Sequence, residues 1–156
     1  HMLLTTSRKP SQRTRSFSQR LSRIMGWRYI NRGKMSLRDV LIEARGPVAV
    51  VSERHGNPAR ITFLDERGGE RGYILFNPSF EMKKPELADK AVRVSSCPPG
   101  SEGLCNLMGL EVDESSSRDA WSIRTDEEYA WVMELMDARG TPAGFKLLIR
   151  DFRVGE

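Results

Sequence analysis

Residues 3–34 read LLTTSRKPSQRTRSFSQRLSRIMGWRYINRGK and contain nine Lys and Arg residues without a single Asp or Glu. The segment begins with an apolar run that predicts a short strand over Leu3–Thr6. It continues into a helical pattern over Ser11–Met25, whose apolar face consists of Phe17, Leu21, Ile24 and Met25. This order predicts a basic amphipathic helix that follows a strand and packs against a sheet.

The basic charge is concentrated at this end of the chain. Residues 1–38 hold ten basic groups and no acid, whereas residues 39–156 hold 15 basic and 21 acidic groups, and the net charge is only +4. An ordinary solvated surface, which is the alternative interpretation, mixes both signs. A face that binds phosphate excludes acids because each acid would repel the ligand. The asymmetry therefore favours a nucleic acid as partner.

The composition is typical of a globular protein, with 38% hydrophobic and 29% charged residues. The length of 156 residues fits one domain, or two small ones that share a core. We expect a single domain over residues 2–156, with His1 as an addition ahead of the native start. No apolar run approaches the roughly 18 residues that span a bilayer, so we expect a cytoplasmic protein with no membrane partner.

Two pairs of short stretches indicate an internal duplication. LTTSRKPS (Leu4–Ser11) resembles RVSSCPPGS (Arg93–Ser101), each a strand-like run that turns into a helix. EARGP (Glu43–Pro47) resembles DARGTP (Asp137–Pro142), and we expect each to close a helix before a strand. The two offsets, 89 and 94 positions, are similar. We therefore expect similar halves, approximately residues 3–80 and 91–154.

The elements expected in each half agree with a duplication. In the first half, strands over Trp27–Ile30 and Val48–Ser52 flank a helix capped by Ser36. A hairpin over Arg60–Leu64 and Tyr73–Phe76 is expected as an insert between the two halves. The second half is expected to contain strands over Ala91–Ser95, Ala120–Arg124 and Phe145–Phe152, and a helix over Ser101–Leu110. Each half then has the order βαβαβ, which predicts an α/β fold with a mixed sheet and helices packed on it.

This order requires a second helix in the second half. We expect Asp126 to cap that helix, because apolar residues follow it at helical spacing. The side chains expected to face inward are Tyr129, Val132, Met133 and Met136.

The first helix supplies most of the candidate binding residues. Arg13, Arg20 and Arg23 fall on one flank of its apolar face, whereas Arg15 falls elsewhere. Guanidinium groups bind phosphate through two hydrogen bonds at once. The full set of expected RNA-binding residues is Arg8, Lys9, Arg13, Arg20, Arg23, Arg28, Arg32 and Lys34.

Two further features lie directly after this helix. Trp27 and Tyr29 alternate with Arg28, so both rings face away from Arg28 if the segment is a strand. We expect both rings to belong to the core; stacking platforms for unpaired bases are the alternative. The NRGK stretch (Asn31–Lys34) is either a simple glycine turn or a turn that presents its cations and backbone N–H groups to a phosphate.

Residues of the kind that carry catalysis are sparse. Cys97 and Cys105 lack the histidine cluster of a zinc site; we expect reduced, packed thiols in an intracellular protein, with a disulfide as the alternative. His55 lies in a turn, HGNP, where a surface histidine is the ordinary expectation. The sequence contains no HxxxH, DxD, GxSxG or GxxxxGK[ST] motif. We therefore expect no catalysis, no metal and no cofactor.

The combination of these motifs resembles a known family. TTSRKPSQRTRSFSQRLSRI followed by NRGKMSLRDVL is similar to the start of the Brix domain, which is found in proteins of ribosome biogenesis. ERHGNPARITFL and the final GFKLLIRDFRVGE are similar to later strands of that family. The family's Gly-Pro-Thr segment is absent from ERGGERGYILFNPSF, so the chain resembles the compact archaeal form of the small-subunit rRNA-processing branch.

The resemblance implies two halves that are each similar to the anticodon-binding domain of class IIa tRNA synthetases. It also implies binding of precursor rRNA without catalysis. Further partners implied by it are small guide RNA–protein particles and other assembly factors, and we expect a monomer.

Two other functions remain open from the residues alone. One is an interaction scaffold whose basic face binds an acidic protein, and the other is an RNA-processing enzyme. Residues 91–125 hold three Arg and no Lys against five acids, so under the RNA-binding hypothesis only the first half should bind strongly.

Overall fold

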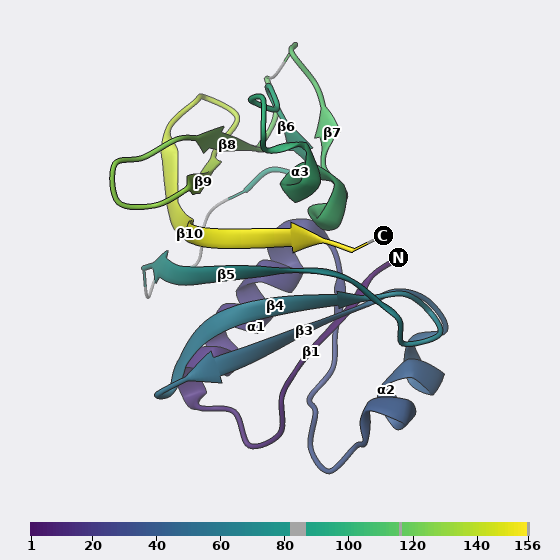
Figure 1. Cartoon of the computed structure of the whole chain (residues 1–156). Helices are drawn as coiled ribbons and strands as arrows, with labels where there is room; N and C mark the ends of the chain where they lie inside the picture. Colours follow the sequence, from purple (N-terminus) through teal and green to yellow (C-terminus); the bar gives the residue numbers. More distant parts are fainter. Residues whose placement is uncertain (82–86, 116, 156) are drawn as a thin grey trace.

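The computed structural model describes residues 1–81, 87–115 and 117–155, which form one curled ten-stranded sheet with three helices (Figure 1). The first half consists of β1 (Leu3–Thr6), α1 (Gln12–Met25), β2 (Arg28–Tyr29), α2 (Leu37–Ala44), β3 (Val48–Arg54), β4 (Asn57–Leu64) and β5 (Glu70–Phe80). The second half consists of β6 (Arg93–Val94), α3 (Glu102–Met108), β7 (Glu111–Val112), β8 (Ala120–Arg124), β9 (Trp131–Met136) and β10 (Pro142–Val154).

The strand order is β2-β1-β3-β4-β5-β10-β9-β8-β6-β7, and the two halves meet where β5 pairs antiparallel with β10. In the first half, β1 is parallel to β2 and β3, and β4 and β5 follow as antiparallel neighbours. In the second half, β6 is parallel to β7 and β8, and β9 and β10 follow antiparallel. The predicted mixed sheet is therefore confirmed, and both halves share its order and strand directions.

One main core connects the two halves, because it contains buried side chains of α1, of α3 and of strands from both. Phe17 lies within α1 and is fully buried. Its ring centroid lies 5.1 Å from that of Phe76 in β5 and 5.5 Å from that of Phe145 in β10. The indole N–H of Trp121 in β8 also donates to Met25 Sδ over 3.2 Å. The predicted apolar face of α1 is confirmed, and it packs on both halves at once.

A smaller core lies on the other side of the sheet, under α2. Val40 of α2 packs there with Leu3, Val48 and Leu64, whereas Leu4 belongs to the main core. Successive strand residues point to opposite faces, so α1 and α2 cover opposite faces of the first half. Ser36 caps α2 as predicted, in a reciprocal hydrogen-bonded pair with Asp39.

The N-terminus of α1 is fixed by a carboxylate from a neighbouring strand. Ser11 caps the helix through its hydroxyl, which accepts from the backbone N–H of Thr14. Glu53, near the end of β3, accepts a 3.0 Å hydrogen bond from the Ser11 N–H and a 2.5 Å hydrogen bond from the Thr14 hydroxyl. These bonds, above all the one from Thr14, lower the pKa of Glu53 below its ordinary value. A negative charge at this position also stabilises the helix dipole.

One predicted element is wrong. The helix expected after Asp126 is replaced by β9, in which Met133 and Leu135 alternate into the main core. Asp126 does accept from the backbone N–H groups of Glu128 and Tyr129, as a helix cap would. The chain then extends instead of coiling, because a short apolar run fits either a strand or a helix. The second half therefore lacks the βαβαβ order, and the two-residue strand β7 was not predicted.

The predicted match between EARGP (Glu43–Pro47) and DARGTP (Asp137–Pro142) is also wrong. EARGP leads from α2 into β3, whereas DARGTP is the turn between β9 and β10. The structural counterpart of that turn joins β4 to β5. Asp65 and Asp137 each accept from the N–H groups two and four residues later, and each donates its own N–H to the carbonyl four residues later. Each turn contains a glycine at positive φ, Gly68 or Gly140. The two turns also share the sequence pattern D-x-R-G, at residues 65–68 and 137–140.

We predict that Glu53→Gln makes the protein less stable at neutral pH by about 1–2 kcal/mol, because a charged hydrogen-bond acceptor is lost. A lowered native pKa contributes stability that is present above the ordinary carboxyl pKa and is lost as the pH falls through the native pKa. The deficit should therefore be largest at neutral pH and shrink as the pH falls through the lowered pKa of Glu53, because the wild-type side chain then becomes protonated too. Urea unfolding over a series of pH values from neutral to acidic, with Glu66→Gln as exposed control, measures this; a deficit that does not change with pH would contradict it.

Candidate nucleic-acid interface

Three arginines on the outer side of α1 form what we call the arginine ridge (Arg13, Arg20 and Arg23); Arg13 and Arg23 are exposed and Arg20 is partly buried. The helix carries no acid along its whole length. The Arg13 and Arg20 guanidinium carbons lie 4.7 Å and 5.4 Å from the ring centroid of Phe80, at the end of β5. Arg20 also donates to the Glu81 carbonyl oxygen. Aromatic and backbone contacts thus orient two of the three cations before any ligand binds.

A second basic site lies on the other flank of α1, and we call it the edge pocket because it adjoins β2, an outer strand of the sheet. Its volume is about 390 Å³, and its lining includes Lys9, Arg15, Tyr29, Asn31, Arg32 and Gly33. The loops that follow the parallel strands β1 and β2 supply most of these residues, α1 supplies Arg15, and β2 itself supplies Tyr29. The carboxyl ends of parallel strands are a common location for ligand sites.

Arg32 connects the two loops of the edge pocket through hydrogen bonds. Its guanidinium donates to the carbonyl oxygens of Thr6 over 2.9 Å and Met35 over 2.8 Å, which ties the NRGK turn to the end of β1. Burial, with the nearby charge of Arg8, lowers the pKa of Arg32. Arg32 therefore has a positioning role in addition to the charge predicted for it.

The structure divides the predicted set of eight cations. The ridge unites Arg13, Arg20 and Arg23, and the pocket unites Lys9 with Arg32. Arg8 donates to the Met35 carbonyl, Lys34 is exposed in the NRGK turn, and Arg28 forms an exposed ion pair with Glu43. Arg15, which the helical wheel placed apart from the ridge, lines the pocket. The expectation that Trp27 and Tyr29 pack on the core opposite Arg28 is confirmed, yet Tyr29 also lines the pocket.

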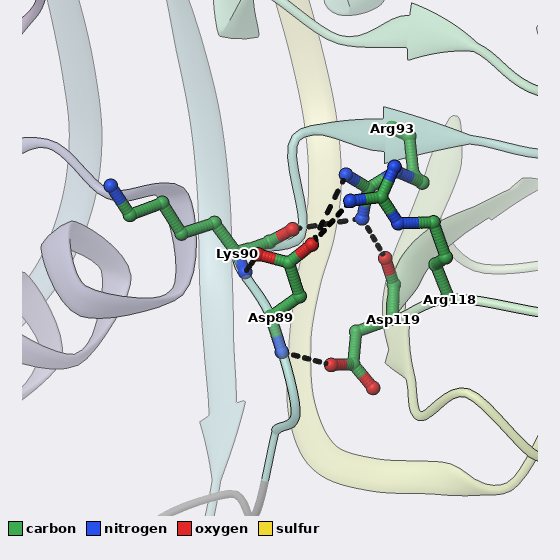
Figure 2. Close-up of polar contacts among 5 residues, drawn as sticks. All are labelled: Asp89, Lys90, Arg93, Arg118 and Asp119. Atoms are coloured by element: carbon green, nitrogen blue, oxygen red, sulfur yellow. Dashed lines mark hydrogen bonds and ion pairs between the residues drawn. The ribbon is translucent and has the colours of Figure 1, made fainter.

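Two arginines of the second half, Arg93 and Arg118, are engaged in a network of hydrogen bonds and ion pairs (Figure 2). Arg93 is only 7% exposed and donates to the carbonyl oxygens of Lys90 over 2.9 Å and Asp119 over 2.8 Å. Asp89 pairs with Arg118 over 2.6 Å and lies 3.8 Å from Arg93. The Asp119 carboxylate accepts from the Asp89 N–H. This network fastens the chain segment between the halves to β8, and Arg124 pairs with Glu134 on the neighbouring strand.

Strand register identifies the counterpart of the edge pocket in the second half. Arg28 and Tyr29 pair with Leu3 and Leu4 of β1, and Glu111 and Val112 pair with Arg93 and Val94 of β6. An acid and a small aliphatic residue therefore occupy the places of Arg28 and Tyr29. A groove of about 430 Å³ lies there, lined by Cys97, Glu102, Cys105, Leu110 and Val112 among others.

Other chemistry is limited in the part of the chain that the structure describes. No three His, Cys, Asp or Glu side chains gather there to hold a metal ion. Cys97 and Cys105 are free thiols with their sulfur atoms 2.6 Å apart, and burial raises the pKa of Cys105 to about 12. His55 is exposed in its turn. None of the helices in the described residues is long and apolar enough to cross a bilayer.

Comparison with known proteins gives a consistent family. The crystal structure of Mil, an archaeal Imp4-like protein, is 95% identical, covers 99% of this chain and all of its own, and superposes with a TM-score of 0.94. Relatives from Methanosarcina barkeri (48% identical over 68 residues) and Archaeoglobus fulgidus (50% over 77 residues) are each described as a "Probable Brix domain-containing ribosomal biogenesis protein". The chain belongs to the Brix-domain family, as an archaeal Imp4-like protein. The resemblance read from the sequence is thus confirmed.

The matches to this Imp4-like chain differ in extent. They cover 43% of both chains for the M. barkeri relative and 49% of both for the A. fulgidus relative, so the chain spans about half the length of the curated relatives it matches. No protein-family model matches the chain. A solved structure from Aeropyrum pernix K1, described as a probable ribosomal biogenesis protein, is 24% identical with a TM-score of 0.75 over 97% of this chain and 96% of its own. That likeness concerns the fold alone.

We predict that Arg93→Ala lowers the free energy of unfolding by about 3 kcal/mol, because it removes a buried side chain and leaves the carbonyl oxygen of the buried Asp119 unpaired. Arg124→Ala is the matched control, since an exposed ion pair contributes at most about 1 kcal/mol. Urea denaturation of both variants measures the difference. Equal losses would show that the Arg93 network does not fasten the segment between the halves to β8.

Proposed function

We propose that this Imp4-like chain is an RNA-binding ribosome-biogenesis factor that acts on precursor rRNA without catalysing a reaction. The names of its relatives suggest ribosome biogenesis, and the Imp4-like family suggests the small-subunit rRNA-processing branch. The proposed partners are precursor rRNA, small guide RNA–protein particles and other assembly factors, for a monomer that acts in the cytoplasm. The unit that acts is a single domain over residues 2–156.

The arginine ridge is the observation that carries the proposal. Arg13, Arg20 and Arg23 project from a helix without acids, and the buried side chain of Phe17 holds that helix on the sheet. A rigid row of guanidinium groups loses little conformational entropy when it binds phosphates. Backbone phosphates dominate the affinity of RNA-binding proteins, so a row of this kind suits RNA whatever its sequence.

We further propose that the two halves arose by duplication and that each is related to an anticodon-binding domain. The shared strand order and the D-x-R-G turns support this proposal. So do the helix ends, because α1 and α3 both end at Met-Gly, with Gly26 and Gly109 left-handed. The helices differ in length, since α1 has 14 residues and α3 has seven.

We predict that replacing Arg13, Arg20 and Arg23 together with Gln abolishes most binding of a precursor rRNA fragment. Each single replacement should lower the slope of log affinity against log salt by about one, because one phosphate contact is lost. Filter binding at several salt concentrations measures both effects. The matched control is the triple replacement of Arg118, Arg124 and Arg139 with Gln in the second half.

Unchanged affinity of the ridge variant, with its urea midpoint near that of wild type, would contradict the proposal. If wild-type protein fails to bind RNA but binds an acidic protein in a salt-dependent manner, the scaffold function would replace it. Turnover of a labelled precursor by the pure protein would instead support an RNA-processing enzyme.

We predict that bound RNA protects the arginines of the first half more than those of the second. Phenylglyoxal modifies exposed guanidinium groups, and mass spectrometry compares Arg13 and Arg23 with Arg118 and Arg139. Arg139 is a sensitive control because its side chain is 87% exposed. Equal protection in both halves would contradict the division of function between them.

A further inference from the structure

We propose that the edge pocket binds one unpaired nucleotide of the RNA, with its base stacked on Tyr29 and its phosphates held by Lys9, Arg15 and Arg32. This inference rests on the proposed function and adds a recognition site for single-stranded RNA beside the arginine ridge. The contacts of Tyr29, the charges around it and the contrast with the second half each support it.

Tyr29 is placed to receive a base. Its ring is half-buried, with one part packed on the main core and another lining the pocket. Its hydroxyl donates to Asn31 Oδ1 over 3.2 Å, which fixes the ring and leaves the amide donors of Asn31 for the edge of a base. Stacking on an aromatic ring is the common way in which proteins hold unpaired bases. The volume of about 390 Å³ falls in the range of small-ligand pockets, roughly 300–1,000 Å³.

The pocket concentrates cations that have no acidic partner. Within the described residues, Lys9, Arg15 and Arg32 form no ion pair with a carboxylate. Arg15 lies close enough to Tyr29 to oppose the rise in the pKa of its hydroxyl that burial causes. Bound phosphate would relieve the mutual repulsion of these cations, and it is the anion that accompanies every base.

The equivalent edge of the second half has different side chains from those of the edge pocket. Val112 occupies the register position of Tyr29, and Glu111 that of Arg28. Among the described residues that line the groove at that edge there is neither an aromatic ring nor a cation, although the strand arrangement is the same. The edge pocket therefore depends on the side chains of the first half and does not follow from the fold.

The location favours an unpaired nucleotide over a duplex. The pocket is bounded by two loops and a helix, and a base must leave its stack to contact the face of Tyr29. Bases inside an RNA helix present only their edges in a groove. The ridge, in contrast, lies on the outer side of α1, where the exposed Arg13 and Arg23 are within reach of phosphates of either form.

The test compares a short oligouridine with a hairpin duplex of equal length, by fluorescence anisotropy on the full chain. Tyr29→Leu should weaken oligouridine binding by about 5- to 150-fold, as expected for one lost base–aromatic stack, and leave duplex binding within about twofold. Tyr29→Phe should stay close to wild type. Val112→Ala, at the equivalent position of the second half, should change neither.

Two further measurements keep the test decisive if Tyr29→Leu folds poorly. Asn31→Ala and Arg15→Gln alter exposed side chains and should also weaken oligouridine more than duplex. Photocrosslinking of wild-type protein with 5-iodouridine RNA should give an adduct on the peptide that contains Tyr29.

The outcomes separate the two proposals. If wild-type protein binds neither probe, the proposed function itself fails. If it binds RNA and loses binding in the ridge variant, while Tyr29→Leu, Asn31→Ala and Arg15→Gln bind oligouridine normally, only the edge pocket is overturned. An equal loss for oligouridine and duplex, or a crosslink confined to the second half, would also overturn it.

Discussion

The packing of Phe17 between Phe76 and Phe145 is the contact on which the rest of the structure depends. One ring joins the strand that ends the first half to the strand that ends the second, so the helix that carries it belongs to both. Interior side chains of this kind are close-packed and tolerate little displacement. The orientation of α1, and with it the direction of every cation on its outer side, is therefore determined by the core.

The N-terminus of α1 is occupied by a carboxylate of the protein itself, which leaves the flanks of the helix for contacts with a ligand. Helix N-termini ordinarily attract anions, yet here the carboxylate of Glu53 already occupies that position with two hydrogen bonds. Under the proposed function, a phosphate would therefore meet the helix on its flanks, where the arginine ridge and the edge pocket lie. The protein uses its own acid as a structural anion at the helix N-terminus.

Most of the first half could be predicted from the sequence because its local signals agree with its tertiary structure. The apolar face of α1 and the caps Ser11 and Ser36 each depend on neighbours within a few residues. The strand β9 could not be distinguished from a helix, since its run WVMELM is apolar except for Glu134 and fits either spacing. Its pairing with β10 decides the outcome. The edge pocket was missed for a related reason: Arg15 and Tyr29 are 14 positions apart, and only the pairing of β1 with β2 brings them together.

The two outer strands of the sheet have a consequence for the behaviour of the protein in solution. An open sheet of ten strands offers two edges, and long, flat edges pair with other copies and aggregate. Here both outer strands, β2 and β7, are only two residues long, and each contains a charged residue, Arg28 or Glu111. Few backbone groups are therefore exposed in strand geometry at either end. Pairing of a second copy with either edge of the sheet is therefore disfavoured.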